Sequence, residues 1–175
     1  WMRNPVAHTG GINNLIIDLA RLDSKIPIKV SGVVGDDENG QFIVDSLREY
    51  PNINIEGIVK KGRTAVTFAM TEKESKQRTF FFDPGSSLEF HEKQIDFKKI
   101  KADIFHLEYL LLLGTLDQPD EDYGTKAAKV LATAQKYEME TSIDMVSEEG
   151  NRYQKVVWPA LKYTDYCVVD EVEGT

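Results

Sequence analysis

The stretch IKVSGVVGDDENGQFIVDSLREYPNINIEGIV, residues 28–59, has the pattern of a strand, a helix and a second strand. Residues 28–35 are rich in β-branched side chains and end at a glycine, which is typical of a buried strand. Residues 36–50 begin with two aspartates, whose charge suits a helix N-terminus, and then carry apolar side chains at helical spacing. The spacing predicts an inward face made of Phe42, Ile43, Ser46 and Leu47. Because a short strand follows at residues 53–59, the stretch predicts a βαβ unit with parallel strands.

The same alternation continues along the chain. A helix-periodic run follows the paired glycines near the N-terminus, and strands and helices alternate again beyond residue 101. These later elements are predicted at residues 102–107, 123–138, 140–146, 149–163 and 165–170. Two β-type runs joined by a charged loop, residues 63–83, interrupt the order and predict an antiparallel hairpin. We therefore expect an α/β fold with a mostly parallel sheet, helices on both faces and a small antiparallel β lid, in one incomplete domain over residues 1–175.

Composition narrows the classes of function. The formal net charge is −8, which disfavours nucleic-acid binding, because that affinity comes from clustered Lys and Arg. Cys167 is the single cysteine, so no intramolecular disulfide is expected, and a reducing, cytoplasmic setting fits best. No apolar run approaches the ~18 residues of a membrane span, so we expect no membrane partner.

Two nucleotide-binding signatures are excluded. The stretch GIVKKGRT, residues 57–64, nearly matches a phosphate-binding loop, but Arg63 replaces the lysine and a strand follows instead of a helix. The chain contains no G-x-G-x-x-G pattern. We therefore interpret residues 57–64 as a connection between strands.

Polar residues at the predicted turns and strand ends are the candidate site. Gly10 and Gly11 either let the backbone approach a polar ligand or only turn the chain. Asn14 either contacts that ligand or, like Asn13, caps the following helix. Ligands of parallel sheets lie at the carboxyl ends of the strands, and the candidate positions there are Gly35-Asp36-Asp37, Glu108, Asp144 and Asp170. His106 is expected to be a buried histidine with satisfied partners rather than a ligand.

Several segments occur in an order that resembles one protein family. They are TGGINNLIIDLARLD (9–23), VSGVVGDDENG (30–40), RTAVTFAM and QRTFFFDPGSS (63–70 and 77–87), ADIFHLEYLLLL (102–113), SIDMV (142–146) and YTDYCVVDEVEGT (163–175). This ordered set resembles the PfkB family, the ribokinase-like carbohydrate kinases. The family's N-x-x-E element is matched by Asp170-Glu171-Val172-Glu173, with aspartate in place of asparagine.

The resemblance implies a kinase that transfers the γ-phosphoryl group of ATP, with Mg²⁺, to a hydroxyl of a sugar or related alcohol. It implies that the sugar contacts are made by Gly10, Gly11, Asn14 and Glu108. Asp170 and Glu173 stand where the family organises magnesium and phosphate, a role that suits carboxylate oxygens. For each residue the alternative is structural: a turn, a helix cap or a solvated carboxylate. Ile16 occupies a position that is usually small in the family, so it is expected to crowd the ligand pocket.

The resemblance also implies that parts of the family's fold lie outside this sequence. These are the first strand and the C-terminal segment with the anion hole, the catalytic base and the adenine pocket. We therefore expect no catalytic residue in the chain and no activity, because phosphoryl transfer depends on positioning and charge stabilisation. The alternative is a non-catalytic small-molecule-binding or interaction protein with a degenerate ribokinase-like fold.

The hairpin of residues 63–83 is the candidate surface for a homodimer. Exposed antiparallel strand edges favour pairing with another chain. The alternative is that its aromatic residues, Phe80 and Phe82, are ordinary core residues.

Overall fold

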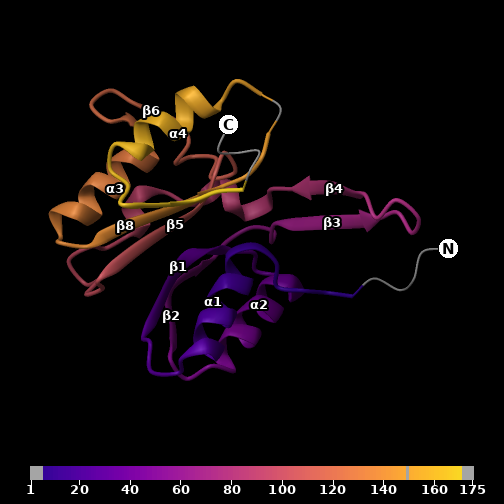
Figure 1. Cartoon of the computed structure of the whole chain (residues 1–175). Coiled ribbons are helices and arrows are strands. Elements are labelled where there is room, and N and C mark those ends of the chain that lie inside the picture. The colour runs from indigo at the N-terminus through magenta and orange to yellow at the C-terminus, as the bar shows by residue number, and fades with distance from the viewer. Residues whose placement is uncertain (1–5, 149, 171–175) are drawn as a thin grey trace.

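The computed structural model describes residues 6–148 and 150–170 of the chain (Figure 1). It confirms the expected α/β class, because the described residues form four α-helices, two parallel sheets and small antiparallel pairs. Within these residues, no helix is both long enough and apolar enough to cross a bilayer.

The N-terminal part of the chain is a helix followed by the predicted βαβ unit. Its elements are α1 (Gly11–Leu22), β1 (Ile28–Val34), α2 (Glu38–Arg48) and β2 (Ile53–Lys60). β1 and β2 pair in parallel, from Ile28 opposite Ile53 to Val34 opposite Lys60, so the parallel pairing predicted from residues 28–59 is confirmed.

A small core holds this unit together. Ile16 and Ala20 of α1 pack with Leu47 of α2 and Ile53 of β2, and all four side chains are buried. The expectation that Ile16 crowds a ligand pocket is therefore wrong, because its side chain points into this core.

Both helices of the unit differ in detail from the sequence prediction. α1 begins at Gly11 with Gly10 as N-cap and without a side-chain cap, so Asn13 and Asn14 lie inside the first turn and do not cap it. In α2, Phe42 is exposed and Val44 is buried instead. The helix is turned this way because Gly40 lies against the backbone of β1's end, where a Cβ would meet the carbonyl oxygen of Gly35.

The C-terminal part is a second parallel sheet covered by two helices. Its strands are β5 (Ile104–Leu110), β8 (Glu140–Met145) and β9 (Tyr166–Val168), in the spatial order β5-β8-β9. The helices are α3 (Lys126–Lys136) and α4 (Tyr153–Leu161), and a short pair, β6 (Pro119–Asp120) and β7 (Gly124–Thr125), precedes α3.

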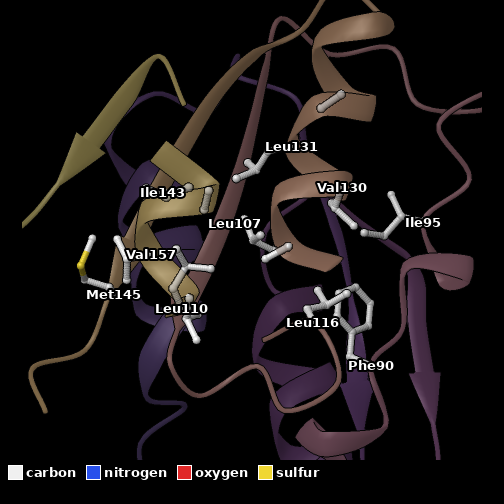
Figure 2. Close-up of a cluster of buried hydrophobic side chains, with 14 of the residues drawn as sticks. Phe90, Ile95, Leu107, Leu110, Leu116, Val130, Leu131, Ile143, Met145 and Val157 are labelled. Carbon is white, nitrogen blue, oxygen red and sulfur yellow. The ribbon is translucent and has the colours of Figure 1, made fainter. Parts of the chain in front are cut away.

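The larger core lies between this sheet and its helices (Figure 2). Leu107 and Leu110 of β5 and Ile143 of β8 are buried there against Val130 and Leu131 of α3. Since α4 contributes to the same cluster, α3 and α4 cover one and the same face of the sheet. The opposite face of β5 and β8 is covered by neither α3 nor α4.

The parallel strands form two separate sheets within residues 6–148 and 150–170, whereas the sequence suggested one. The two parts still touch, because Val33 of β1 packs against the larger core. The short helix η1 (Gly85–Glu89) also contacts β1. A second short helix, η2 (Glu92–Gln94), follows before β5.

The predicted hairpin is present between the two sheets. β3 (Val66–Thr71) and β4 (Arg78–Asp83) pair antiparallel, from Val66 opposite Asp83 to Thr71 opposite Arg78, and project from the body as an arm (Figure 1). Phe80 is 55 % exposed and Phe82 42 % exposed, so the alternative that they are core residues is wrong. Their strand extends beyond the body of the chain, where no core is available to cover them.

Candidate functional site

The face of β5 and β8 that α3 and α4 leave uncovered is polar. Successive side chains of a strand point to opposite faces of a sheet. Since Leu107 and Ile143 point into the larger core, His106 and Ser142 lie on the other face. Glu108 lies beside them, with its Oε2 3.4 Å from Nε2 of His106. His106 and Ser142 are direct neighbours across the two strands.

Glu108 is almost completely buried on this polar face. Its side chain is only 3 % exposed, and its Oε2 has no hydrogen-bond partner within the described part of the chain. Nε2 of His106 lies 3.4 Å from that oxygen without hydrogen-bond geometry. A buried carboxylate oxygen without a partner is costly, so this atom is suited to receive a donor from a ligand.

Gly11, the second residue of the glycine pair, lies next to Tyr109, the residue that follows Glu108. Gly10 and Gly11 both have positive φ, +60° and +44°, which favours glycine. A Cβ on Gly11 would lie 3.4 Å from Cε2 of Tyr109, the residue after Glu108. The start of α1 and the carboxyl end of β5 therefore meet at the Tyr109 ring.

Asn14 is exposed on the first turn of α1. Its Oδ1 accepts a hydrogen bond from Oγ1 of Thr9 at 3.2 Å, while Nδ2 of Asn13 donates to the carbonyl oxygen of Thr9 at 3.1 Å. The two amides therefore brace the segment that carries the glycine pair.

Asp170 lies two residues beyond the end of β9. Because β5, β8 and β9 are parallel neighbours, Glu108, Asp144 and Asp170 occupy the carboxyl ends of adjacent strands. Oγ of Ser147 donates to Asp170 at 3.4 Å. Glu173, the second residue of the predicted magnesium and phosphate pair, lies outside the described residues. In residues 6–148 and 150–170 no three His, Cys, Asp or Glu side chains cluster as a metal site.

A groove of about 360 Å³ runs between the base of the hairpin and the loop after β5. Phe82 of β4 forms one wall, and Leu111 and Leu112 form another. Asp117 and Arg152 contribute charged groups to its lining. The groove has the lid residue Phe82 as a wall, and neither Glu108 nor the glycine pair belongs to its lining.

Asp117 and Arg152 hold the loop that follows β5. The Asp117 carboxylate, almost fully buried, accepts backbone N–H groups of Leu111 at 3.2 Å and Leu113 at 3.0 Å. Arg152 donates to the carbonyl oxygen of Leu111 at 3.0 Å and lies 3.4 Å from Asp117. Together they fix Leu111 at a positive φ of +79°. Burial raises the pKa of Asp117, although these donors oppose the shift.

Asp37 fastens the base of the hairpin to the N-terminal unit. Its Oδ1 accepts the N–H of Gly40 at 2.8 Å, so it is the N-cap of α2. Its two oxygens also accept the hydroxyl and the N–H of Thr64, the latter at 2.8 Å. These hydrogen bonds, Thr64 first, hold the pKa of Asp37 below its ordinary value. The segment VGDDENG, residues 34–40, thus positions the lid.

Sequence reasoning missed the roles of these loop residues. Asp37 was expected only to place charge at a helix N-terminus, and its partner Thr64 lies 27 residues away. The sequence around Asp117 and Arg152 predicts no role for them, because a lone aspartate and a lone arginine outside a motif carry no local signal. The only hint in the sequence is a single aspartate in the loop that follows a predicted strand.

Comparison with known proteins places this arrangement in a family. The model of the pfkB family of carbohydrate kinases matches residues 3–173, so the chain belongs to the pfkB family of carbohydrate kinases. A search of curated protein sequences gave no match.

Solved structures show the same fold. Fructokinase from Xylella fastidiosa is 24 % identical, with a TM-score of 0.70, and the match covers 90 % of this chain and 49 % of that one. 2-Dehydro-3-deoxygluconokinase from Thermotoga maritima is 18 % identical, with a TM-score of 0.76, and the match covers 97 % of this chain and 52 % of that one. Ribokinase from Giardia lamblia is 16 % identical, with a TM-score of 0.64, and the match covers 95 % of this chain and 51 % of that one. The chain therefore spans about half the length of these structures.

Proposed function

We propose that this chain carries the sugar-binding site of an ATP-dependent carbohydrate kinase. The observation that carries the proposal is Glu108, a buried carboxylate with an unpartnered oxygen at the carboxyl edge of a parallel sheet. A carboxylate accepts hydrogen bonds strongly from the hydroxyl groups of a sugar. The family membership and the kinases among the solved relatives support the same assignment.

The glycine pair and the lid complete the proposed sugar site. At Gly10 and Gly11 the absence of side chains lets the backbone come close to a polyol. Asn14 is proposed as a further contact through its amide, with Oδ1 already engaged by Thr9. Phe82 supplies an apolar wall from the lid, and exclusion of water by such a wall strengthens the polar contacts inside.

ATP and Mg²⁺ are the proposed cofactors of the whole protein. Asp170 and Glu173 would help to hold the metal, which neutralises phosphate charge during phosphoryl transfer when it is bound. Of this pair, Asp170 is described and carries a carboxylate at the same sheet edge as Glu108. The expected inactivity of the 175-residue chain stays a prediction, as does the cytoplasmic setting.

A homodimer through the hairpin is part of the proposal. Phe68 and Phe81 are paired across β3 and β4, lie on one face of the arm and are 63 % and 57 % exposed. Phe82 belongs to the alternate face, which lines the groove. One face of the lid is thus available for a second copy of the chain while the other faces the proposed sugar.

Calorimetric titration of the chain with D-fructose, D-ribose and 2-dehydro-3-deoxy-D-gluconate tests the proposal. At least one sugar should bind, and E108Q should weaken it about tenfold or more, because a hydrogen bond to a charged acceptor is lost. E121Q is the matched control, since Glu121 is an exposed glutamate remote from β5 in sequence. Because the 175-residue chain is expected to be inactive, ATP turnover is measured with the whole protein and the sugar that binds, and it then separates a kinase from a non-catalytic binding protein. Equal affinities for E108Q and wild type would refute the assignment.

A further inference from the structure

His106 and Glu108 each have a buried polar atom to which the described residues offer no hydrogen bond. Nε2 of His106 and Oε2 of Glu108 are both buried, and neither has a hydrogen-bond partner in the described part of the chain. They lie 3.4 Å apart but do not form a hydrogen bond with each other. Buried polar atoms in native proteins almost always have partners, so a missing group is indicated at this point.

Ser142 and Glu108 together favour one tautomer of the His106 ring. Its Oγ lies 3.0 Å from Nδ1 of His106, so one of these two atoms donates to the other. If Nδ1 carried the proton, Nε2 would turn a lone pair toward the carboxylate of Glu108, which is electrostatically unfavourable. The favoured arrangement has Ser142 donating to Nδ1, which leaves Nε2–H as a free donor beside a free acceptor.

We propose that His106 and Glu108 bind the same hydroxyl group of the sugar. The hydroxyl donates its proton to Oε2 of Glu108 and accepts a hydrogen bond from Nε2–H of His106. A hydroxyl is the simplest group that offers one donor and one acceptor from a single atom. The inference rests on the proposed function, and it makes His106 a specificity-determining residue of that site, with Ser142 as its positioning residue.

The proposal predicts that the pair discriminates by chemistry as well as by size. An unsatisfied donor and acceptor would remain buried if the sugar lacked this hydroxyl, and sites built in this way reject the deoxy analogue strongly. A fluorine or a hydrogen at the same carbon would leave Glu108 without its donor.

Nitrogen-15 NMR of the imidazole ring tests the first step without any ligand. In the wild-type chain we expect Nε2 of His106 to carry a proton and Nδ1 to accept the hydrogen bond from Ser142. S142A should lower the population of that tautomer, because the hydroxyl that donates to Nδ1 is removed. A wild-type ring that carries a proton on Nδ1, neutral or charged, overturns the proposal.

Two near-isosteric variants test the contact itself. H106Q places an amide nitrogen near the Nε2 position, whereas H106N reaches only the Nδ1 position and keeps the contact with Ser142. For the sugar that binds, H106N should weaken affinity about tenfold or more, and H106Q should stay within about threefold of wild type. H8Q serves as the control, because His8 is exposed, and circular dichroism confirms that each variant is folded. Equal effects of H106N and H106Q, or the reverse order, overturn the proposal.

Monodeoxy analogues of that sugar show whether one hydroxyl is shared. A single analogue should lose sensitivity to H106N and to E108Q together, because the group that both residues contact is gone. Sensitivity lost at two different carbons overturns the shared contact. If E108Q weakens binding and H106N does not, this inference fails while the proposed function stands. If no sugar binds, or if E108Q has no effect, both fail.

Discussion

Gly11 and Tyr109 are in near contact: a Cβ on Gly11 would lie 3.4 Å from Cε2 of the tyrosine ring. This relationship joins the first turn of α1 to the carboxyl end of β5, although the two residues are far apart in sequence. It links the glycine pair to the residue that follows Glu108.

Replacing Gly11 by alanine should therefore affect binding as well as stability. Both G10A and G11A are expected to lower the free energy of unfolding by about 1–3 kcal/mol, because both backbones have positive φ. Only G11A adds a methyl group against Tyr109, since a Cβ on Gly10 meets nothing within 4 Å. We expect only G11A to lower sugar affinity, measured by calorimetry. Equal affinity of the two variants would contradict the placement of the site.

The close backbone approach at the lid base predicts a large difference between two neighbouring glycines. A Cβ on Gly35 would lie 2.1 Å from the backbone nitrogen of Thr64, while one on Gly32 meets nothing within 4 Å. Urea unfolding should show G35A destabilised by about 1–3 kcal/mol or more, because the backbone must shift. G32A should stay within about 0.5 kcal/mol of wild type. A stable G35A would mean that the hairpin base is not packed as described.

The attachment of the lid through Asp37 should depend on pH. The folded protein holds the pKa of this carboxyl below its ordinary value of 3.8, chiefly through the hydrogen bonds from Thr64. The ionised form therefore stabilises the fold fully above that value, and the contribution is lost as the pH falls through the lower folded pKa. D37N should be less stable than wild type at pH 7, and the difference should shrink below about pH 4 in urea titrations. D36N removes one negative charge at the neighbouring exposed position and serves as the control.

The outline of the fold was predictable because it depends on local periodicity. The strand and helix pattern of residues 28–59 and the two β-type runs of the hairpin needed no long-range information. The bond between Asp37 and Thr64 spans 27 residues, and that between Arg152 and Leu111 spans 41. Such contacts depend on how loops pack, which the periodicity of a strand or helix does not encode.

The candidate site was predictable only in part for a similar reason. The position of Glu108 followed from its place after a strand, but its relation to His106 did not. The register of β5 against β8 shifts between Leu107 and Leu110, so simple alternation does not fix the geometry there. His106 was expected to be satisfied, and Ser142 satisfies only one of its two nitrogens.

Asp117 should respond to pH in the opposite direction to Asp37. Burial raises the pKa of Asp117 in the folded protein above its ordinary value of 3.8. The folded state then binds more protons than the unfolded state, so its contribution to stability falls as the pH rises through that window. The free energy of unfolding of wild type relative to D117N should therefore decrease from about pH 4 upward. A difference that is constant with pH would contradict the burial of this carboxylate.

A charge on the face of the hairpin that carries Phe68 and Phe81 should abolish the proposed homodimer. F68K or F81K places a lysine on the face of the hairpin that carries both phenylalanines. Sedimentation velocity should show a dimer for wild type and a monomer for either variant, because a desolvated lysine is unfavourable in such an interface. T67K alters the alternate face of β3 and should leave the dimer intact. A monomeric wild type would remove this part of the proposal.

The alternation of side chains along β5 and β8 separates two roles. One set of positions forms the hydrophobic interior, while the intervening positions, 106, 108 and 142, carry the proposed sugar contacts. Single exchanges at these three positions are therefore expected to change the proposed recognition and to leave the interior intact. A one-residue insertion within either strand would invert both sets and remove recognition and stability at once.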